Sequence, residues 1–135
     1  MGVYETVVTG LWEIKVIDGQ RGGPGGLQIA VEQPSAGLIV VSPTGELDLS
    51  NKDAFAEAIE GTRTTGATAL VLDLTGLTFM DSSGLRILLD AWNESQLADR
   101  RLMLVVPKDG LVRRVLEISG CDGILPIVDL LADAV

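Results

Sequence analysis

The sequence contains no histidine and only one cysteine, Cys121. Without histidine, a Ser-His-Asp triad, a Cys-His dyad and an imidazole-ligated zinc site are all excluded. A single cysteine forms no disulfide within the chain and has no Cys-x-x-Cys partner for redox or metal chemistry, which fits a reducing compartment. We therefore expect Cys121 to be a small buried residue, and the sequence predicts neither a metal site nor a cofactor.

The sequence is also short of basic residues and of long apolar runs. It has 10 Lys and Arg against 19 Asp and Glu, so its formal net charge is −9. This excess of acid repels the phosphates of nucleic acids and anionic lipid headgroups, so we expect no nucleic-acid partner. No apolar stretch approaches the roughly 20 residues that cross a bilayer, and no basic region followed by an apolar run opens the chain. The sequence thus predicts a cytoplasmic protein without membrane insertion.

The 135 residues are 47% hydrophobic, which suffices for one domain with its own core. Residues 1–26 are interpreted as an N-terminal extension and residues 27–135 as the domain. In the extension, Trp12, Ile14 and Val16 alternate with charged residues, which predicts an extra strand at an edge of the sheet. Residues 18–26 are rich in glycine and lack the Gly-Lys-Ser/Thr ending of a phosphate-binding loop, so they are interpreted as a flexible connection.

From residue 27 onward, strand and helix patterns alternate. Strands are predicted at 27–32, 38–41, 69–74, 102–106 and 124–128, and the first two should pair as neighbours. Helices are predicted from about 50 to 61, from 82 onward and from 112 to 119, with one or two helical turns at 129–135. This alternation favours an α/β fold with a mostly parallel sheet.

Helix ends and helix faces can also be predicted. Ser50 and Asp53 have the spacing of a capping box, and Gly61 is a plausible end of that first helix. Two apolar stripes should face the core: Phe55, Ala58 and Ile59 in the first helix, and Leu85, Leu88, Leu89 and Trp92 in the second.

The start of the second helix holds the most informative residues: Asp81, Ser82, Ser83 and Gly84. A phosphate placed there would meet unpaired backbone N–H groups and the positive end of the helix dipole, so the site is chemically suited to phosphorylation. The simpler alternative is that Asp81 or Ser82 only caps the helix.

The run DLTGLTFMDSSGLRILL at 73–89 closely resembles the signature of STAS domains, and specifically of bacterial anti-sigma factor antagonists. The run TGELD at 44–48 and the run LEISG at 116–120 match the same family, and the resemblance extends from about residue 27 to residue 128. It implies a STAS-like fold, with a mostly parallel central sheet and helices packed mainly on one face.

The resemblance also implies a function and a set of site residues. The chain would be a non-enzymatic phosphoswitch with Ser82 as phosphoacceptor and with Asp48, Asp81, Ser83 and Gly84 in partner binding. The implied partner is an anti-sigma factor that is itself a serine kinase of the ATPase-fold type. Unphosphorylated, the chain would bind this partner and free a sigma factor for transcription; phosphorylation would release it, and a phosphatase would reset Ser82. A weak homodimer is also left open.

Arg86 departs from the family pattern, because a small residue is common there, and it could alter partner choice. Three alternatives stay open. A STAS subunit of a lipid-transport or stressosome-like assembly would also bind proteins. A response-regulator receiver would accept phosphate on Asp73, with Lys108 after a later strand, but no acidic pair follows the first strand. A hydrolase using Ser82 would lack a base to activate its hydroxyl.

Overall fold

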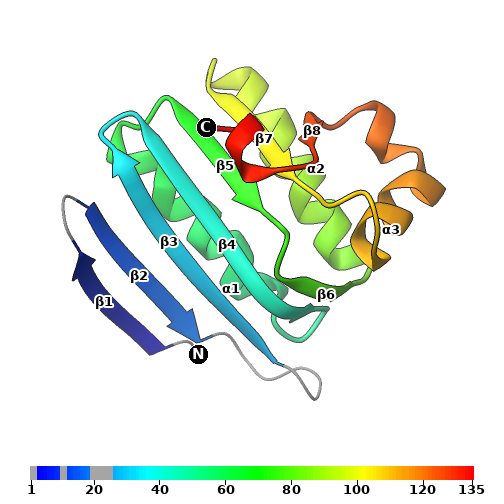
Figure 1. Ribbon diagram of the computed structural model, residues 1–135, viewed down its shortest axis with the longest axis horizontal. Coiled ribbons are helices and arrows are strands. Elements are labelled where there is room, and N and C mark those ends of the chain that lie inside the picture. Colours follow the sequence, from blue (N-terminus) through cyan, green and yellow to red (C-terminus); the bar gives the residue numbers. More distant parts are fainter. Residues whose placement is uncertain (1–2, 10–11, 19–25) are drawn as a thin grey trace.

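The computed structural model describes residues 3–9, 12–18 and 26–135, with side chains from residue 26 on. The described residues form a single sheet with helices packed behind it (Figure 1). The strands are β1 (Val3–Thr9), β2 (Trp12–Asp18), β3 (Leu27–Ser35), β4 (Leu38–Leu47), β5 (Ala69–Asp73), β6 (Leu77–Met80), β7 (Arg101–Val105) and β8 (Ile127–Val128). The α-helices are α1 (Lys52–Gly61), α2 (Ser82–Leu97) and α3 (Leu111–Ser119), and 3-10 turns occupy Thr62–Thr65, Cys121–Gly123 and Leu131–Asp133.

The sheet is mixed, with the strand order β1-β2-β3-β4-β5-β7-β8. Strands β1 to β4 pair antiparallel, whereas β4, β5, β7 and β8 pair parallel. The short strand β6 continues the parallel part by pairing with the end of β4. The α/β fold, the β3–β4 hairpin and the parallel pairing predicted for the second half of the chain are confirmed.

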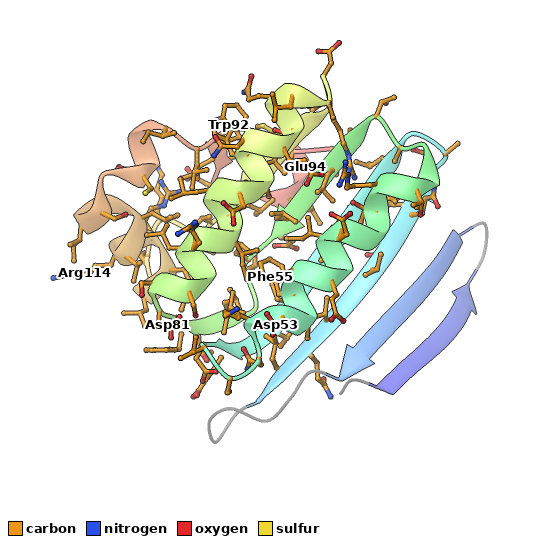
Figure 2. The ribbon with its side chains drawn as sticks, turned by 180° about the vertical axis from the view of Figure 1, so that it is seen from behind. Asp53, Phe55, Asp81, Trp92, Glu94 and Arg114 are labelled. Atoms are coloured by element: carbon orange, nitrogen blue, oxygen red, sulfur yellow. The ribbon has the colours of Figure 1, made fainter. Side chains whose placement is uncertain are left out.

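Two layers of core cover the two faces of the parallel strands. On the helix side, α1 and α2 pack over alternate residues of β4, β5 and β7, such as Leu70 and Leu72 of β5 (Figures 1 and 2). On the opposite face, Val71 lies in a smaller cluster with Val40, Val105 and Ala134. Strand β5 is therefore apolar on both faces, as its sequence predicted, and each fully buried Leu or Val contributes roughly 1.5 to 3 kcal/mol.

Helix α1 begins differently from the prediction. Its N-cap is Asn51, which makes no side-chain capping bond, so the predicted Ser50–Asp53 capping box is wrong. The helix begins one residue later than predicted, and the Ser50 hydroxyl donates to Oδ1 of Asp48, at 2.6 Å, within the turn that follows β4. The predicted end at Gly61 and the buried stripe of Phe55, Ala58 and Ile59 are confirmed.

Helix α2 begins at Ser82 as predicted, but its buried face is rotated from the predicted one. Of the predicted stripe only Leu88 is buried, while Leu85, Leu89 and Trp92 are half-buried. The buried residues of the helix are Gly84, Ile87, Leu88, Ala91 and Ser95. The glycine at 84 lets the start of this face approach Leu47 and Met80 closely, and the hydrophobic spacing alone does not reveal that approach.

The C-terminal elements agree with the sequence. Helix α3 ends at Ser119 before Gly120, whose φ of 78° is left-handed, and Cys121 is buried. The last strand is reduced to Ile127–Val128, and the predicted terminal helical turn is the 3-10 turn Leu131–Asp133. In the described part of the chain, no helix combines the length and apolarity needed to cross a membrane.

At the other edge, β2 covers the residues predicted as an extra strand and pairs antiparallel with β3, with Ile17 opposite Ile29. Strand β1, which the sequence did not reveal, pairs with β2 in turn and lies at the edge of the sheet, so the edge position predicted for the strand around residues 12–16 is wrong. The loop predicted at 18–26 lies outside the described residues from 19 to 25. The division into an extension at 1–26 and a domain at 27–135 stays a prediction.

Candidate functional site

Three aspartates lie at the carboxyl ends of the parallel strands β4, β5 and β6. In each case Oδ1 accepts two hydrogen bonds from the residue two positions later, one from its backbone N–H and one from its side-chain hydroxyl. This local turn closes the end of each strand and engages the hydroxyl as a donor. The pairs are Asp48 with Ser50, Asp73 with Thr75, and Asp81 with Ser83.

The register of β4 and β6 brings Asp48 and Asp81 to the same edge. Leu47 lies opposite Met80 in the parallel pair, and each aspartate is the next residue along its own strand. The backbone N–H of Asp81 also donates to the carbonyl of Leu47, at 3.2 Å. Two carboxylates that are 33 positions apart in the sequence therefore flank the start of α2.

Asp81 is the N-cap of α2. Its backbone is extended, and Oδ1 accepts the backbone N–H groups of Ser83 at 2.9 Å and Gly84 at 3.4 Å. The sequence alternative that Asp81 caps the helix is thus confirmed for this residue. Burial raises the pKa of its carboxyl, but hydrogen bonds from the Ser83 hydroxyl and from the backbone N–H groups of Gly84, Ser83 and Leu49 outweigh burial, so the pKa lies below its ordinary value.

Gly84 is buried at the contact between α2 and the end of β4. A Cβ at this position would lie 2.6 Å from Cγ of Met80 and 2.8 Å from Cδ2 of Leu47, closer than side-chain carbons approach. The glycine thus allows the first turn of α2 to pack against the strand ends, which fixes where Ser82 is presented.

Ser82 differs from its neighbour Ser83 in exposure and in hydrogen bonding. It is the first residue of α2 and is exposed, whereas Ser83 is half-buried with its hydroxyl on Asp81. Among residues 26–135, none forms a hydrogen bond with the Ser82 hydroxyl. Of the two adjacent serines, Ser82 therefore presents the accessible oxygen.

Sequence reasoning missed three residues around this site. Asn51, 2% exposed, accepts the N–H of Asp48 at 3.0 Å and donates to the carbonyl of Glu46 at 2.8 Å, so it holds the turn that carries Asp48. Leu49 and Phe79 are exposed by 71% and 39%, and they follow or lie within the strand ends that carry Asp48 and Asp81. The one available sequence signal was the apolar Leu49 between polar turn residues.

Arg86 lies one helical turn after Ser82 on α2. Its Nε is 3.5 Å from Oδ1 of Asp90, and the side chains of this pair are 78% and 63% exposed. Such an exposed pair contributes little to stability, so Arg86 is free to turn toward other charges near Ser82.

The residues of the receiver alternative each contact another side chain. The Asp73 carboxylate accepts the backbone N–H and the hydroxyl of Thr75, so it holds the turn that follows β5. Lys108 pairs with Asp129, at 3.6 Å. Within the described residues, no group of three acidic, cysteine or histidine side chains is placed to hold a metal ion.

Comparisons with known proteins by sequence and by structure agree on one family and one kind of relative. A family model described as the STAS domain matches residues 28–134. The anti-sigma-F factor antagonist RsfB of Mycobacterium tuberculosis is 34% identical over 98 residues, which cover 73% of this chain and 79% of that protein. An anti-sigma F factor antagonist of Paenibacillus polymyxa is 34% identical over 106 residues, covering 76% and 87%. The crystal structure of an anti-sigma factor antagonist from Mycobacterium paratuberculosis superposes with a TM-score of 0.74 at 29% identity, over 83% of this chain and 93% of that one.

Proposed function

The chain belongs to the STAS domain family, and we propose that it is an anti-sigma factor antagonist whose binding is switched by phosphorylation of Ser82. In its unmodified form it binds an anti-sigma factor in the cytoplasm and thereby frees the sigma factor held there. The anti-sigma factor is a serine kinase, and its transfer of phosphate to Ser82 ends the interaction. A phosphatase restores the unmodified form.

The observation that carries this proposal is the contrast between Ser82 and Ser83. Ser82 is exposed and its hydroxyl has no hydrogen-bond partner among residues 26–135, so a kinase can reach it without disturbing the fold. The Ser83 hydroxyl is held by the carboxylate that caps the helix, and modifying it would break that cap. The geometry therefore favours Ser82 as the acceptor.

The chemistry requires no catalysis by this chain. The Ser82 oxygen forms a bond to the γ-phosphorus of ATP held by the kinase, the bond from that phosphorus to ADP breaks, and the serine proton passes to a base of the kinase. The start of α2 tolerates the product, because the positive end of the helix dipole lies there.

The charge of the phosphate explains the release. Phosphorylation adds about −1.5 to −2 charges beside Asp48 and Asp81, which already flank the helix start. A partner surface shaped for the unmodified serine then meets an unmatched dianion. A coupling of about 1 to 3 kcal/mol would weaken binding about 5-fold to 150-fold without any rearrangement of the fold.

We assign the site residues two kinds of role. The exposed residues Ser82, Leu49 and Phe79 and the half-buried Asp48 form the surface that meets the partner, hereafter the Ser82 face. Asp81, Ser83 and Gly84 act at the same interface chiefly by fixing the first turn of α2, through the cap and the close packing described above.

The acceptor assignment is tested by phosphopeptide mapping. The full chain is incubated with MgATP and each anti-sigma factor kinase of the source organism, alongside the Ser82→Ala and Ser83→Ala variants. We expect one phosphate on Ser82 in the unmodified sequence and in Ser83→Ala, and none in Ser82→Ala. Phosphate on Ser83, Ser50 or Asp73 would overturn the assignment.

A further inference from the structure

Arg86 lies on α2 midway between Ser82 and Asp90, four residues from each. Residues four apart on a helix are neighbours on its surface, with Cβ atoms about 5 to 6 Å apart, so the guanidinium of Arg86 can reach either position. All three residues are exposed and therefore form one row along the outside of α2. Arg86 is also the only basic residue of this helix.

In the unmodified chain, Arg86 is held weakly. Its Nε lies 3.5 Å from Oδ1 of Asp90, and its side chain donates no hydrogen bond to residues 26–135. The order of this pair is the less favourable one, since an acid stabilises a helix more when it precedes the base by four residues than when it follows it. The guanidinium can therefore leave Asp90 with little loss of stability.

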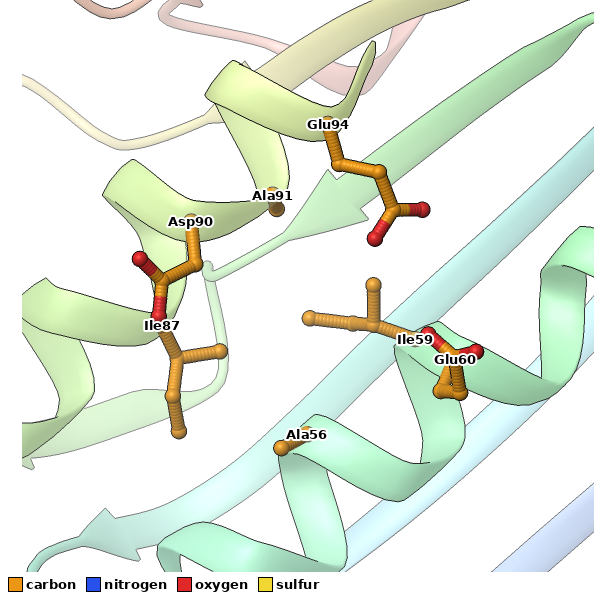
Figure 3. Close-up of a pocket in the computed structure, with 7 residues that line it drawn as sticks. All are labelled: Ala56, Ile59, Glu60, Ile87, Asp90, Ala91 and Glu94. Atoms are coloured by element: carbon orange, nitrogen blue, oxygen red, sulfur yellow. The ribbon is translucent and has the colours of Figure 1, made fainter. Parts of the chain in front are cut away.

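Other charged side chains near α2 have closer partners of their own. Figure 3 shows the Glu94 side chain extending toward α1, and its Oε1 lies 3.0 Å from Nε of Arg63. In the same view the Asp90 carboxylate points back toward the start of α2. Lys52, the first residue of α1, places Nζ 3.0 Å from Oδ1 of Asp53. Compared with these cations, the arginine of the exposed row has the longer ion contact.

A phosphate on Ser82 would offer Arg86 a better partner than Asp90. It would carry about −1.5 to −2 charges and would precede the arginine by four residues, which is the favourable order. A guanidinium can also bond two phosphate oxygens at once, and such bonds are stronger than those between neutral groups. Side chains on a helix lean toward its N-terminus, so the turn that carries Ser82 is the surface that Arg86 most readily covers.

We propose that Arg86 moves from Asp90 to the phosphate when Ser82 is phosphorylated, and that it thereby protects the phosphate from removal. The inference rests on the proposed function, because it concerns the modified form of the same site. Arg86 is present in both forms, so the Ser82 face still gains the full negative charge of the phosphate, and the reason for release is unchanged. The guanidinium covers oxygens that a phosphatase must bind, and the phosphorylated form therefore persists longer.

The pairing is tested by phosphorus-31 NMR on the full chain with phosphoserine installed at position 82 during translation, which requires no kinase. A neighbouring guanidinium favours the dianion, so the second pKa of the phosphate should be higher in Arg86→Gln by a few tenths of a pH unit. Glutamine has nearly the helix propensity of arginine, so the fold is preserved. The carboxylates of Asp48 and Asp81 are present in both chains and cancel in the comparison.

Arg114→Gln is the matched control. It removes the same charge from an exposed position on α3, where Arg114 points away from α2 (Figure 2), and it should leave the phosphate pKa unchanged. A phosphatase of broad specificity should release inorganic phosphate about 1.5-fold to 2-fold faster from Arg86→Gln than from the chain that retains Arg86.

Three results would overturn the inference: a phosphate pKa that is the same with and without Arg86, an equal rise in Arg114→Gln, or equal rates of phosphate release. None of them bears on whether a kinase modifies Ser82, which the phosphopeptide mapping tests separately. Conversely, if no kinase modified Ser82, the proposed function would fail, while the pairing of Arg86 with an installed phosphate would still be measured.

Discussion

The carboxylate of Asp81 accepts both the backbone N–H and the hydroxyl of Ser83, and this pair decides which of two adjacent serines is accessible. The Asp-Ser-Ser-Gly motif offers two hydroxyls in sequence, but only that of Ser83 is bonded to the carboxylate that caps the helix. The remaining hydroxyl, on Ser82, is carried into solvent by the same turn. A hydrogen bond internal to the motif thus separates the part that builds the helix start from the part proposed to be modified.

Gly84 should be intolerant of even a small side chain. In Gly84→Ala the new Cβ would overlap Met80 and Leu47, and overpacking of this kind costs about 1 to 3 kcal/mol, partly offset by about 1 kcal/mol of improved helix propensity. We therefore expect a lower free energy of unfolding in urea and slower phosphorylation of Ser82.

Gly61→Ala is the matched control for that substitution. Gly61 is the last residue of α1, and a Cβ there meets nothing within 4 Å. We expect it to be neutral or stabilising by up to about 1 kcal/mol. If the two alanine variants were equally stable, the close packing of α2 on the strand ends would not restrict position 84.

The lowered pKa of Asp81 makes part of the stability depend on pH. Because the folded pKa lies below the ordinary value of 3.8, the charged carboxylate stabilises the folded state above that value, and the contribution is lost as the pH falls through the folded pKa. In Asp81→Asn the cap is retained but its charge is removed, so we expect a loss of about 0.3 to 1 kcal/mol at pH 7.

The difference between the unmodified chain and Asp81→Asn should shrink as the pH is lowered past 3.8. Urea unfolding at several pH values measures it, with Asp109→Asn at an exposed turn as the control for the change in net charge. A difference that stayed constant or grew in acid would show that the Asp81 charge does not stabilise the helix start.

Asp48 is expected to act in partner binding more than in folding. In Asp48→Asn the Oδ1 acceptor for Ser50 is preserved, so the melting temperature should change by only a few degrees. The lost charge should alter the affinity for the anti-sigma factor or the rate of Ser82 phosphorylation. If the affinity and the phosphorylation rate were unchanged, the role of Asp48 would be limited to stabilising its local turn.

Removal of residues 1–24 should expose the edge of β3. That strand loses the antiparallel pairing that runs from Ile14 opposite Glu32 to Asp18 opposite Gln28, and unpaired edges favour association with other strands. We expect lower stability or concentration-dependent self-association, measured by thermal melting and sedimentation, with phosphorylation of Ser82 largely preserved. A truncated chain that melts unchanged and stays monomeric would show that the extension does not support the sheet.

Local sequence patterns predicted the elements whose own apolar residues or glycines indicate how they are buried or where they end. The alternation in β3, the apolar run of β5 and the glycine after α3 were sufficient for the strands, the order of elements and the helix end. The rotated face of α2 was not predictable from hydrophobicity, because it depends on how closely Gly84 approaches Leu47. Strand β6 was missed because it is four residues long and is defined by pairing with β4.

The candidate site, too, could be predicted only in part from the sequence. The Asp-Ser-Ser-Gly motif and the resemblance that it carries could be found in the sequence. That Asp48 lies beside Asp81 depends on the register of two strands, and the bond from the Ser83 hydroxyl to Asp81 forms only within the folded turn. Ser50 illustrates the reverse case, since its spacing fitted a capping box but its hydroxyl bonds Asp48 instead.

The most direct test of the proposed switch is the dissociation constant of the complex with the cognate anti-sigma factor, measured before and after stoichiometric phosphorylation mapped to Ser82. We expect tight binding of the unmodified chain and of Ser82→Ala, and binding weakened at least about fivefold by the phosphate. Equal affinity of the unmodified and Ser82-phosphorylated chains would contradict the claim that this residue controls the interaction.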